Sequence, residues 1–271
     1  MAGRTNHRSQ PSSKPSTLAV ALLATYNMQY LEATPHPTLS NYVDAYWTAS
    51  GSSTQHSIEK ILPDGCVDII FNLGNDCYTD NGIFLMKPEK TYLVGTMTKY
   101  KETEMDNNTK LLGVRFKPGA VSAFFKFVSL SEITNQTIEL GKFLCLDLRK
   151  LIKSPFELLN QELARNLNKP NLYLLMQIQT IKKSKGQIKI QELASIHCTT
   201  VRQLERNFKE HLGITPKEFV NLVRYQNAMK AIEQRKSNES ILSIAFDFGY
   251  YDHSHLTNDF KRYIGCAPTF I

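Results

Sequence analysis

The chain has 271 residues and a net charge of +7, with 42% hydrophobic and 21% charged residues, so one or two globular domains with sizeable cores are expected. Its five cysteines are scattered and lack C-x2-C spacing, which excludes a recognisable zinc module and argues against a disulfide framework. A reducing, cytoplasmic compartment is therefore expected. No membrane-spanning helix is predicted, because no apolar run approaches the roughly 18 residues that cross a bilayer.

The first 27 residues are rich in Ser, Pro and Thr and carry three basic but no acidic residues. Arg4, Arg8 and Lys14 precede the apolar stretch 18–24, an order that loosely imitates a secretory signal. The stretch is short, and no persuasive small-residue cleavage site follows it. We therefore interpret residues 1–27 as a disordered leader, with recognisable structure beginning directly after Met28.

A β-rich region is predicted from about residue 36 to residue 117. Short runs of β-branched and aromatic residues are separated there by Gly, Pro and Asn, a pattern typical of strands joined by turns in a small barrel or sandwich. The clearest candidate strands are 66–71, 91–94 and 111–116.

Helical patterns follow, over residues 120–128, 140–152 and 156–167. The polar break Asn168-Lys-Pro-Asn ends them and marks the predicted domain boundary. Residues 28–168 are thus expected to form a sensor or dimerisation domain, and residues 169–271 a second domain.

The chain after residue 171 is predicted to be helical throughout, because apolar positions recur at helical spacing between clear start and stop signals. Thr200-x-x-Gln203 and Thr215-Pro-x-Glu218 have the form of capping boxes, which satisfy free N–H groups at the start of a helix. Ser240 and Asp252 are expected to cap two further helices. The predicted helices are 172–183, 190–196, 201–211, 216–235, 241–246 and a last one that begins after Asp252.

A thirteen-residue frame occurs twice in this region. Residues 204–216 and 256–268 share the pattern L-x-x-x-F-K-x-x-[L/I]-G-x-x-P. The apolar residues form one helix face, and Gly followed by Pro is the expected stop. The residues that differ lie mostly on the outward face, as two related helices that read different surfaces would require. Each copy follows a short helix and a tight turn, which is the helix-turn-helix arrangement.

The positive charge is concentrated in the same region. Residues 182–271 contain 14 Lys/Arg against 9 Asp/Glu, a net charge of +5, whereas residues 28–180 contain 15 against 16. An ordinary solvated surface can also be basic, so the charge only supports a nucleic-acid partner.

Residues 171–271 resemble the DNA-binding domain of the AraC/XylS family of bacterial transcription regulators. The matching motifs are E-L-A at 192–194, L-x-R-x-F-K at 204–209, G-I-T-P at 213–216, I-A-x-x-x-G-Y at 244–250, and F-K-R-Y-x-G at 260–265 with His255 and Pro268. The resemblance implies two helix-turn-helix units joined by a long linker helix, and double-stranded DNA as the partner.

By this resemblance, the base-reading side chains lie on the exposed N-terminal faces of the two repeated helices. They are Arg202, Gln203, Glu205 and Arg206 in the first helix, and His253, Ser254, Thr257 and Asn258 in the second. Arg pairs with guanine, Gln and Asn pair with adenine, and Glu accepts from cytosine, so the chemistry suits the role. For His253 and His255, a role in the cap or turn is the alternative to DNA contact.

Phosphate contacts, which set affinity and register without reading sequence, are assigned to four further residues. These are Thr200, Lys209, Lys261 and Arg262.

Three features depart from the family pattern. Cys198 stands in the first turn where the family usually has Gly, Asn258 stands where Arg is common, and the final helix is cut to a stub. The second unit is therefore expected to read sequence less strongly than the first. The helix residues Ala194 and Ala245 are 51 positions apart, whereas the repeat is 52, so the second turn is predicted to be one residue longer.

The segments 62–71 and 113–119 resemble an uncharacterised domain that often precedes AraC-type DNA-binding domains. This resemblance implies a β-rich, partial cupin-like barrel with flanking helices, which makes the whole chain α+β. It also implies sensing or dimerisation. The expected partners besides DNA are a small-molecule effector, a second copy of the chain and RNA polymerase.

No catalytic residue, metal site or cofactor is predicted. His36 and His56 lack metal-ligand spacing, and Asp64, close to Asp68, belongs first to a Pro-Asp-Gly turn. Cys66 and Cys198 are interpreted as small packing residues, because no flanking charges would lower a thiol pKa.

Arg115 alternates with apolar neighbours and faces opposite to Val114 and Phe116 on a predicted strand. It is expected to form a structural salt bridge, with binding of an anionic ligand inside a barrel as the alternative.

Together these features predict a sequence-specific DNA-binding transcription regulator that is not an enzyme. One alternative is a DNA-binding domain fused to a catalytic N-terminal domain of the alkyl-transfer repair type, which would need reactive, metal-paired cysteines that the spacing lacks. Another is a basic module that binds without sequence preference.

Overall fold

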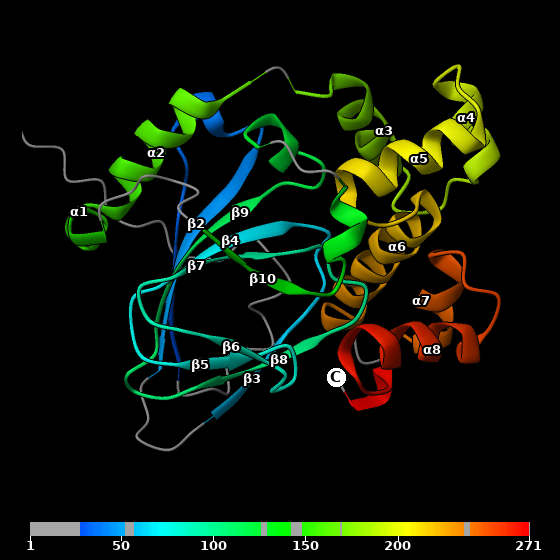
Figure 1. The fold of residues 1–271 in the computed structure, drawn as a ribbon. Coiled ribbons are helices and arrows are strands. Elements are labelled where there is room, and N and C mark those ends of the chain that lie inside the picture. Colours follow the sequence, from blue (N-terminus) through cyan, green and yellow to red (C-terminus); the bar gives the residue numbers. More distant parts are fainter. Residues whose placement is uncertain are drawn as a thin grey trace, which may run out of the picture.

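The computed structural model describes residues 28–51, 57–125, 129–141, 148–168, 170–235 and 239–270. The predicted leader lies outside these residues. Within them the chain forms a β-rich N-terminal part and a helical C-terminal part, which lie side by side (Figure 1). The predicted α+β class is confirmed. No described helix is long and apolar enough to span a bilayer.

The β-rich part is built on a six-stranded antiparallel sheet in the order β1-β2-β9-β4-β7-β10. Two small sheets, β3 with β8 and β5 with β6, complete it. The three clearest predicted strands are confirmed as β4, β7 and β9. The strands are β1 Met28–Ala33, β2 Val43–Gly51, β3 Ser57–Ile61, β4 Val67–Asn72, β5 Cys77–Thr79, β6 Phe84–Met86, β7 Thr91–Val94, β8 Lys101–Met105, β9 Lys110–Phe116 and β10 Thr137–Leu140.

Strand alternation gives the main sheet two apolar faces. Ile69 points to a core closed by the helices α1 (Leu148–Lys153) and α2 (Pro155–Asn166), which cover one face. Ile70 points the other way, to a core shared with the small sheets. Arg115 lies on this second face, opposite to its neighbours in β9, as predicted.

The predicted helix over 120–128 is wrong where the structure describes it. Only the short 3-10 turn η3, Val121–Ala123, forms there. Phe124 and Phe125 are both buried in the core beside Phe116, so the run has no solvent-exposed face of the kind an amphipathic helix needs.

The predicted helix over 140–152 begins too early. Residues 137–140 form β10 instead, because the edge of β7 supplies their backbone hydrogen-bond partners. Residues 142–147 lie outside the described chain, and α1 begins at Leu148. The third predicted segment is confirmed as α2.

Every helix predicted after residue 171 is confirmed to within two residues. They are α3 Leu172–Lys183, α4 Ile190–Ile196, α5 Val201–Leu212, α6 Pro216–Glu233, α7 Ile241–Asp247 and α8 His253–Ile264, followed by the 3-10 turn η5 Pro268–Phe270.

The predicted N-caps start these helices, but of the two predicted capping boxes only the one at α6 is complete. At α6 the capping box forms in both directions: Glu218 N donates to Thr215 Oγ1 at 3.1 Å, and Thr215 N donates to Glu218 Oε2 at 2.8 Å. The side chains of Thr200, Ser240 and Asp252 accept the predicted N-cap bonds of α5, α7 and α8.

Candidate nucleic-acid interface and ligand pocket

Two pairs of helices in the C-terminal part share one geometry: α4 with α5, and α7 with α8. Each pair is a short helix, a tight turn and a 12-residue helix. The turns close on equivalent bonds, because Thr199 N donates to Ala194 O and Tyr250 N donates to Ala245 O, both at 2.9 Å. These bonds confirm the predicted equivalence of Ala194 and Ala245.

The second turn is one residue longer than the first, as predicted. Thr200, the N-cap of α5, follows Ala194 by six positions, whereas Asp252, the N-cap of α8, follows Ala245 by seven. The extra residue is Tyr251, which is largely exposed.

Cys198 occupies the left-handed position of the first turn. Its φ is +46°, and its counterpart Gly249 has a φ of +71°. The prediction that Cys198 packs inside the protein is wrong: its side chain is exposed, because the turn geometry directs it outward.

The eight predicted base-contact residues lie on the first two turns of α5 and α8. All are exposed except Thr257, which is half-buried and whose hydroxyl lies 3.3 Å from His253 Nδ1. The repeated Leu and Phe positions behind them are fully buried, so both helices turn their polar faces to solvent. Their assignment to bases stays a prediction.

The four predicted phosphate contacts lie in different surroundings. The Thr200 hydroxyl accepts a bond from Gln203 N at 3.1 Å, and Lys209 and Lys261 are exposed. The guanidinium of Arg262 is engaged elsewhere, because its Nε donates to the carbonyl of Thr98 at 3.1 Å. A phosphate contact by Arg262 would require this bond to be exchanged.

Comparison with known proteins bears on both parts of the chain. Residues 193–270 match a family model described as a helix-turn-helix domain, and residues 31–139 match a domain of unknown function (DUF6597). The chain is 33% identical over 76 residues to the HTH-type transcriptional activator RhaS of Escherichia fergusonii. The C-terminal part is an AraC-type helix-turn-helix domain.

The likeness to curated relatives covers a limited share of each protein. The RhaS match spans 28% of this chain and 27% of RhaS. The HTH-type transcriptional regulator MtrA of Neisseria gonorrhoeae is 29% identical over 90 residues, which is 33% of this chain and 29% of MtrA.

Two solved structures show partial likeness. ToxT from Vibrio cholerae aligns over 90% of this chain and 97% of its own, at 10% identity and a TM-score of 0.46. The C-terminal domain of AraT from Geobacillus stearothermophilus aligns over 36% of this chain and 81% of its own, at 22% identity and a TM-score of 0.33.

The AraC-type domain touches the β-rich part at the C-terminal ends of both repeated helices. The stop glycines Gly213 and Gly265 adopt φ of +85° and +86°, as the repeat predicts. The carbonyl of Gly213 accepts a hydrogen bond from Thr134 Oγ1 at 2.6 Å. The carbonyl of Ile264 accepts one from Lys60 Nζ at 3.2 Å. Both helices are therefore held at the end opposite to their predicted reading face.

The linker helix α6 contacts the turn between β3 and β4. Leu62 packs into the same core as Leu222 of α6. At Gly65, whose φ is +81°, a Cβ atom would lie 2.9 Å from the ring of Phe219. The turn therefore fits closely against the linker.

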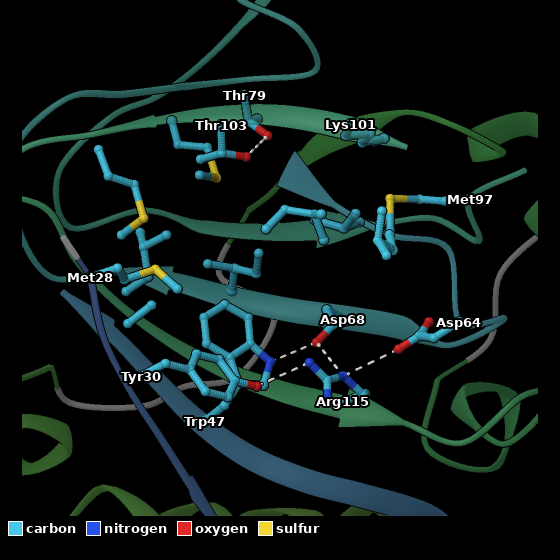
Figure 2. A pocket seen from close by; sticks show the side chains of 18 residues that line it. Met28, Tyr30, Trp47, Asp64, Asp68, Thr79, Met97, Lys101, Thr103 and Arg115 are labelled. Atoms are coloured by element: carbon cyan, nitrogen blue, oxygen red, sulfur yellow. Dashed lines mark hydrogen bonds and ion pairs between the residues drawn. The ribbon is translucent and has the colours of Figure 1, made fainter. Parts of the chain in front are cut away.

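A pocket of about 100 Å³ lies between the main sheet and the small sheets (Figure 2). Its wall is mainly apolar, and Trp47 lies over Gly113, where an added Cβ atom would meet the indole at 2.0 Å. Apolar lining residues include Met28, Trp47, Met86, Met97, Met105 and Leu111. The sequence did not predict the lining of this pocket, because strands far apart in the chain form it.

One end of the pocket carries a group of charged side chains (Figure 2). Arg115 Nη1 lies 3.0 Å from Glu32 Oε1. Its Nε lies 3.4 Å from Asp64 Oδ2 and 3.8 Å from Asp68 Oδ1. Trp47 Nε1 donates to the same Asp68 oxygen at 2.7 Å. The salt-bridge interpretation of Arg115 is therefore confirmed.

The carboxylates of this group compete for one guanidinium. Burial raises the pKa of Asp68 to about 7, Arg115 opposes the rise, and Asp64 adds to it. Burial also raises the pKa of Asp44 above its ordinary range. The positive charge of Arg115 therefore does not offset the cost of desolvating all the carboxylates around it.

The sequence interpretations of Asp64 and Cys66 are confirmed here. Asp64 belongs to a turn, because its Oδ1 accepts from Cys66 N at 2.8 Å, and Cys66 is buried. His36 is exposed and lies beside Thr38, and His56 falls outside the described residues. Within the described chain, no group of three or more His, Cys, Asp or Glu side chains could hold a metal ion.

Proposed function

We propose that this protein is a sequence-specific DNA-binding transcription regulator in which α5 and α8 read two successive major grooves. The exposed, capped N-terminal halves of the two repeated helices carry this proposal. In such an arrangement the first helix of each pair crosses the DNA backbone, and the second helix presents its N-terminal residues to base edges in the major groove. The grooves on one face of DNA recur about every 34 Å.

The β-rich part acts in this proposal as the sensing or dimerisation domain. Its support is the pocket, together with the contacts that join the pocket walls to the AraC-type domain. A ligand changes DNA binding only if its affinity differs between two states of the protein, so a site next to the linker helix is suitably placed.

The test is selection of bound DNA from a random pool with the full chain, followed by footprinting at two salt concentrations. We expect one enriched sequence and a protected region that spans two major grooves on one face. Loss of all binding at the higher salt, with no enriched sequence, would contradict the proposal, because binding through phosphates alone is salt-dependent and does not depend on sequence.

A further inference from the structure

The charged end of the pocket has more carboxylates than cations. The closest acidic partner of Arg115 is Glu32, whose Oε1 lies 3.0 Å from Arg115 Nη1. Lys101, which also lines the pocket, is buried and is paired with the half-buried Asp80 at 2.6 Å. Once these two pairs are formed, Asp64 and Asp68 remain in the wall with a share of a single guanidinium.

The rest of the pocket suits an apolar body. Methionine side chains adapt to ligands of irregular shape, and the wall contains several. The rings of Tyr30 and Trp47 stack with centroids 6.1 Å apart beside the carboxylates, and aromatic faces attract cations. The pocket thus has an acidic end next to aromatic rings and is otherwise apolar. These features are complementary to an amphipathic ligand of positive charge.

We propose that the pocket binds a small apolar molecule with a cationic head, a protonated amine or a quaternary ammonium group, which lies between Asp64, Asp68 and the ring of Trp47. The apolar part extends among the methionines. This assignment deepens the proposed function, and only its regulatory consequence depends on that function.

An anionic ligand fits this site less well. A carboxylate head would have to displace Glu32 or Asp64 from Arg115, and it would lie close to the carboxylates that it displaced. Like charges held together in a poorly hydrated site repel strongly. The pocket therefore selects against the anionic head that Arg115 alone would attract.

The pocket is joined to the DNA-binding domain by two short segments. Leu62 lines the pocket and packs against α6. Met97 lines the pocket, and the carbonyl of the next residue, Thr98, accepts the bond from Arg262 of α8. A ligand that moves either segment would thus act directly on the linker helix or on the second reading helix.

Trp47 makes the test direct, because it is the only tryptophan in the chain and it lines the pocket. Its fluorescence is followed during titration of the full chain, without DNA, with octylamine, octanol and octanoate at neutral pH. The three probes share one alkyl chain and differ in head group. We expect octylamine to bind about tenfold more tightly than octanol, and octanoate more weakly than either. Equal or tighter binding of octanoate would overturn the proposal.

The variant Asp64→Asn removes a charge but keeps the oxygen that accepts from Cys66 N, so the turn is retained. It should abolish the preference for octylamine and leave octanol affinity unchanged. Equal weakening of all three probes would mean a structural role only and would overturn the assignment. The control Glu139→Gln, in an exposed ion pair with Lys90, should leave all three affinities unchanged.

The outcome is independent of the proposed function. A chain that selects no DNA sequence would contradict the regulatory proposal and leave the probe titration intact. A chain that selects DNA but prefers octanoate would contradict only the ligand assignment.

Discussion

At the scale of single residues, the two repeated helices differ where they face solvent. Arg202 and Arg206 are one turn apart on the exposed side of α5, so both guanidinium groups can reach the same groove. The equivalent positions of α8, 52 residues later, hold Ser254 and Asn258, which are shorter and uncharged. The first helix is therefore the stronger candidate for reading guanine.

Substitution of Arg206 by Ala tests this reading. We expect specificity to relax at one base position of the selected site, at a cost of about 1–3 kcal/mol in binding, because a bidentate contact to one base is lost. Affinities for the site and its single-base variants measure the effect. As a control, Lys209→Ala should weaken binding to all sequences alike and reduce its salt dependence. An unchanged base preference in Arg206→Ala would contradict the base contact.

Asp68 should leave a signature in the pH dependence of stability. Its folded-state pKa, raised to about 7 mainly by burial, lies above the value of about 3.9 expected in the unfolded chain. Between these values the folded state binds a proton that the unfolded state lacks, so this group lowers the free energy of unfolding as pH rises from about 4 to 7. The charged groups that face it are Arg115 of β9, Asp64 of the preceding turn and Asp44 of β2.

The variant Asp68→Asn keeps an oxygen that can accept the hydrogen bond from Trp47 Nε1, but it lacks the pH-dependent contribution of Asp68 to the free energy of unfolding. We expect the free energy of unfolding of the variant to fall less between pH 4 and pH 7 than that of the native chain. Denaturant titrations at several pH values measure it. Parallel curves for the two proteins would show that Asp68 titrates at an ordinary pKa.

At the scale of elements, the α4–α5 and α7–α8 turns adopt the same left-handed backbone conformation with different residues. Gly249 adopts the left-handed conformation without a Cβ penalty, whereas Cys198 adopts it with one. The first pair of helices therefore carries a local strain that the second pair lacks.

Cys198→Gly should relieve this strain. We expect the free energy of unfolding to rise by about 1 kcal/mol, because the steric cost removed exceeds the added flexibility of the unfolded chain. Cys198→Ala is the matched control and should give no comparable gain, since it keeps the Cβ atom. Thermal or denaturant unfolding compares the three, and equal stability of the Gly and Ala variants would mean that the backbone of the turn is unstrained.

The helices after residue 171 could be predicted closely from the sequence because their signals are local. A cap such as Thr215 and a stop such as Gly213 lie within a few residues of the turn that they specify. The strand at 137–140 could not be predicted in this way, because it forms only when β7 offers an edge about 45 residues earlier in the chain.

The pocket could not be predicted from the sequence for the same reason. Trp47, Asp68 and Arg115 belong to β2, β4 and β9, and only the strand order of the sheet brings them together. The alternation around Arg115 indicated a buried charge, and it identified neither the three carboxylates nor the cavity beside them.

At the scale of the whole molecule, the β-rich part supports both repeated helices. Contacts from Thr134 and Lys60 end on backbone carbonyls at the C-terminal ends of α5 and α8, which the helices themselves leave without partners. The relative placement of the two faces that are proposed to read DNA therefore depends on a part of the chain that itself carries none of the predicted base contacts.

Thr134→Val removes the hydroxyl that donates to the carbonyl of Gly213 at 2.6 Å while keeping the shape of the side chain. We expect a loss of about 1 kcal/mol in the free energy of unfolding, together with weaker binding to the selected DNA site. Thr134→Ser keeps the hydroxyl and should behave like the native chain. If Val and Ser variants are equivalent in both measurements, the contact does not support α5.

Anchoring at one end turns each helix that is proposed to read DNA into a lever arm. Twelve residues at 1.5 Å per residue place the reading end of α5 or α8 roughly 18 Å from its anchor. A tilt of about 10° at the anchor would then move the reading end by roughly 3 Å, which is close to the 3.4 Å step between base pairs along one strand. A tilt of α5 of this size about its contact with Thr134 would thus carry Arg202 and Arg206 from one base pair toward the next.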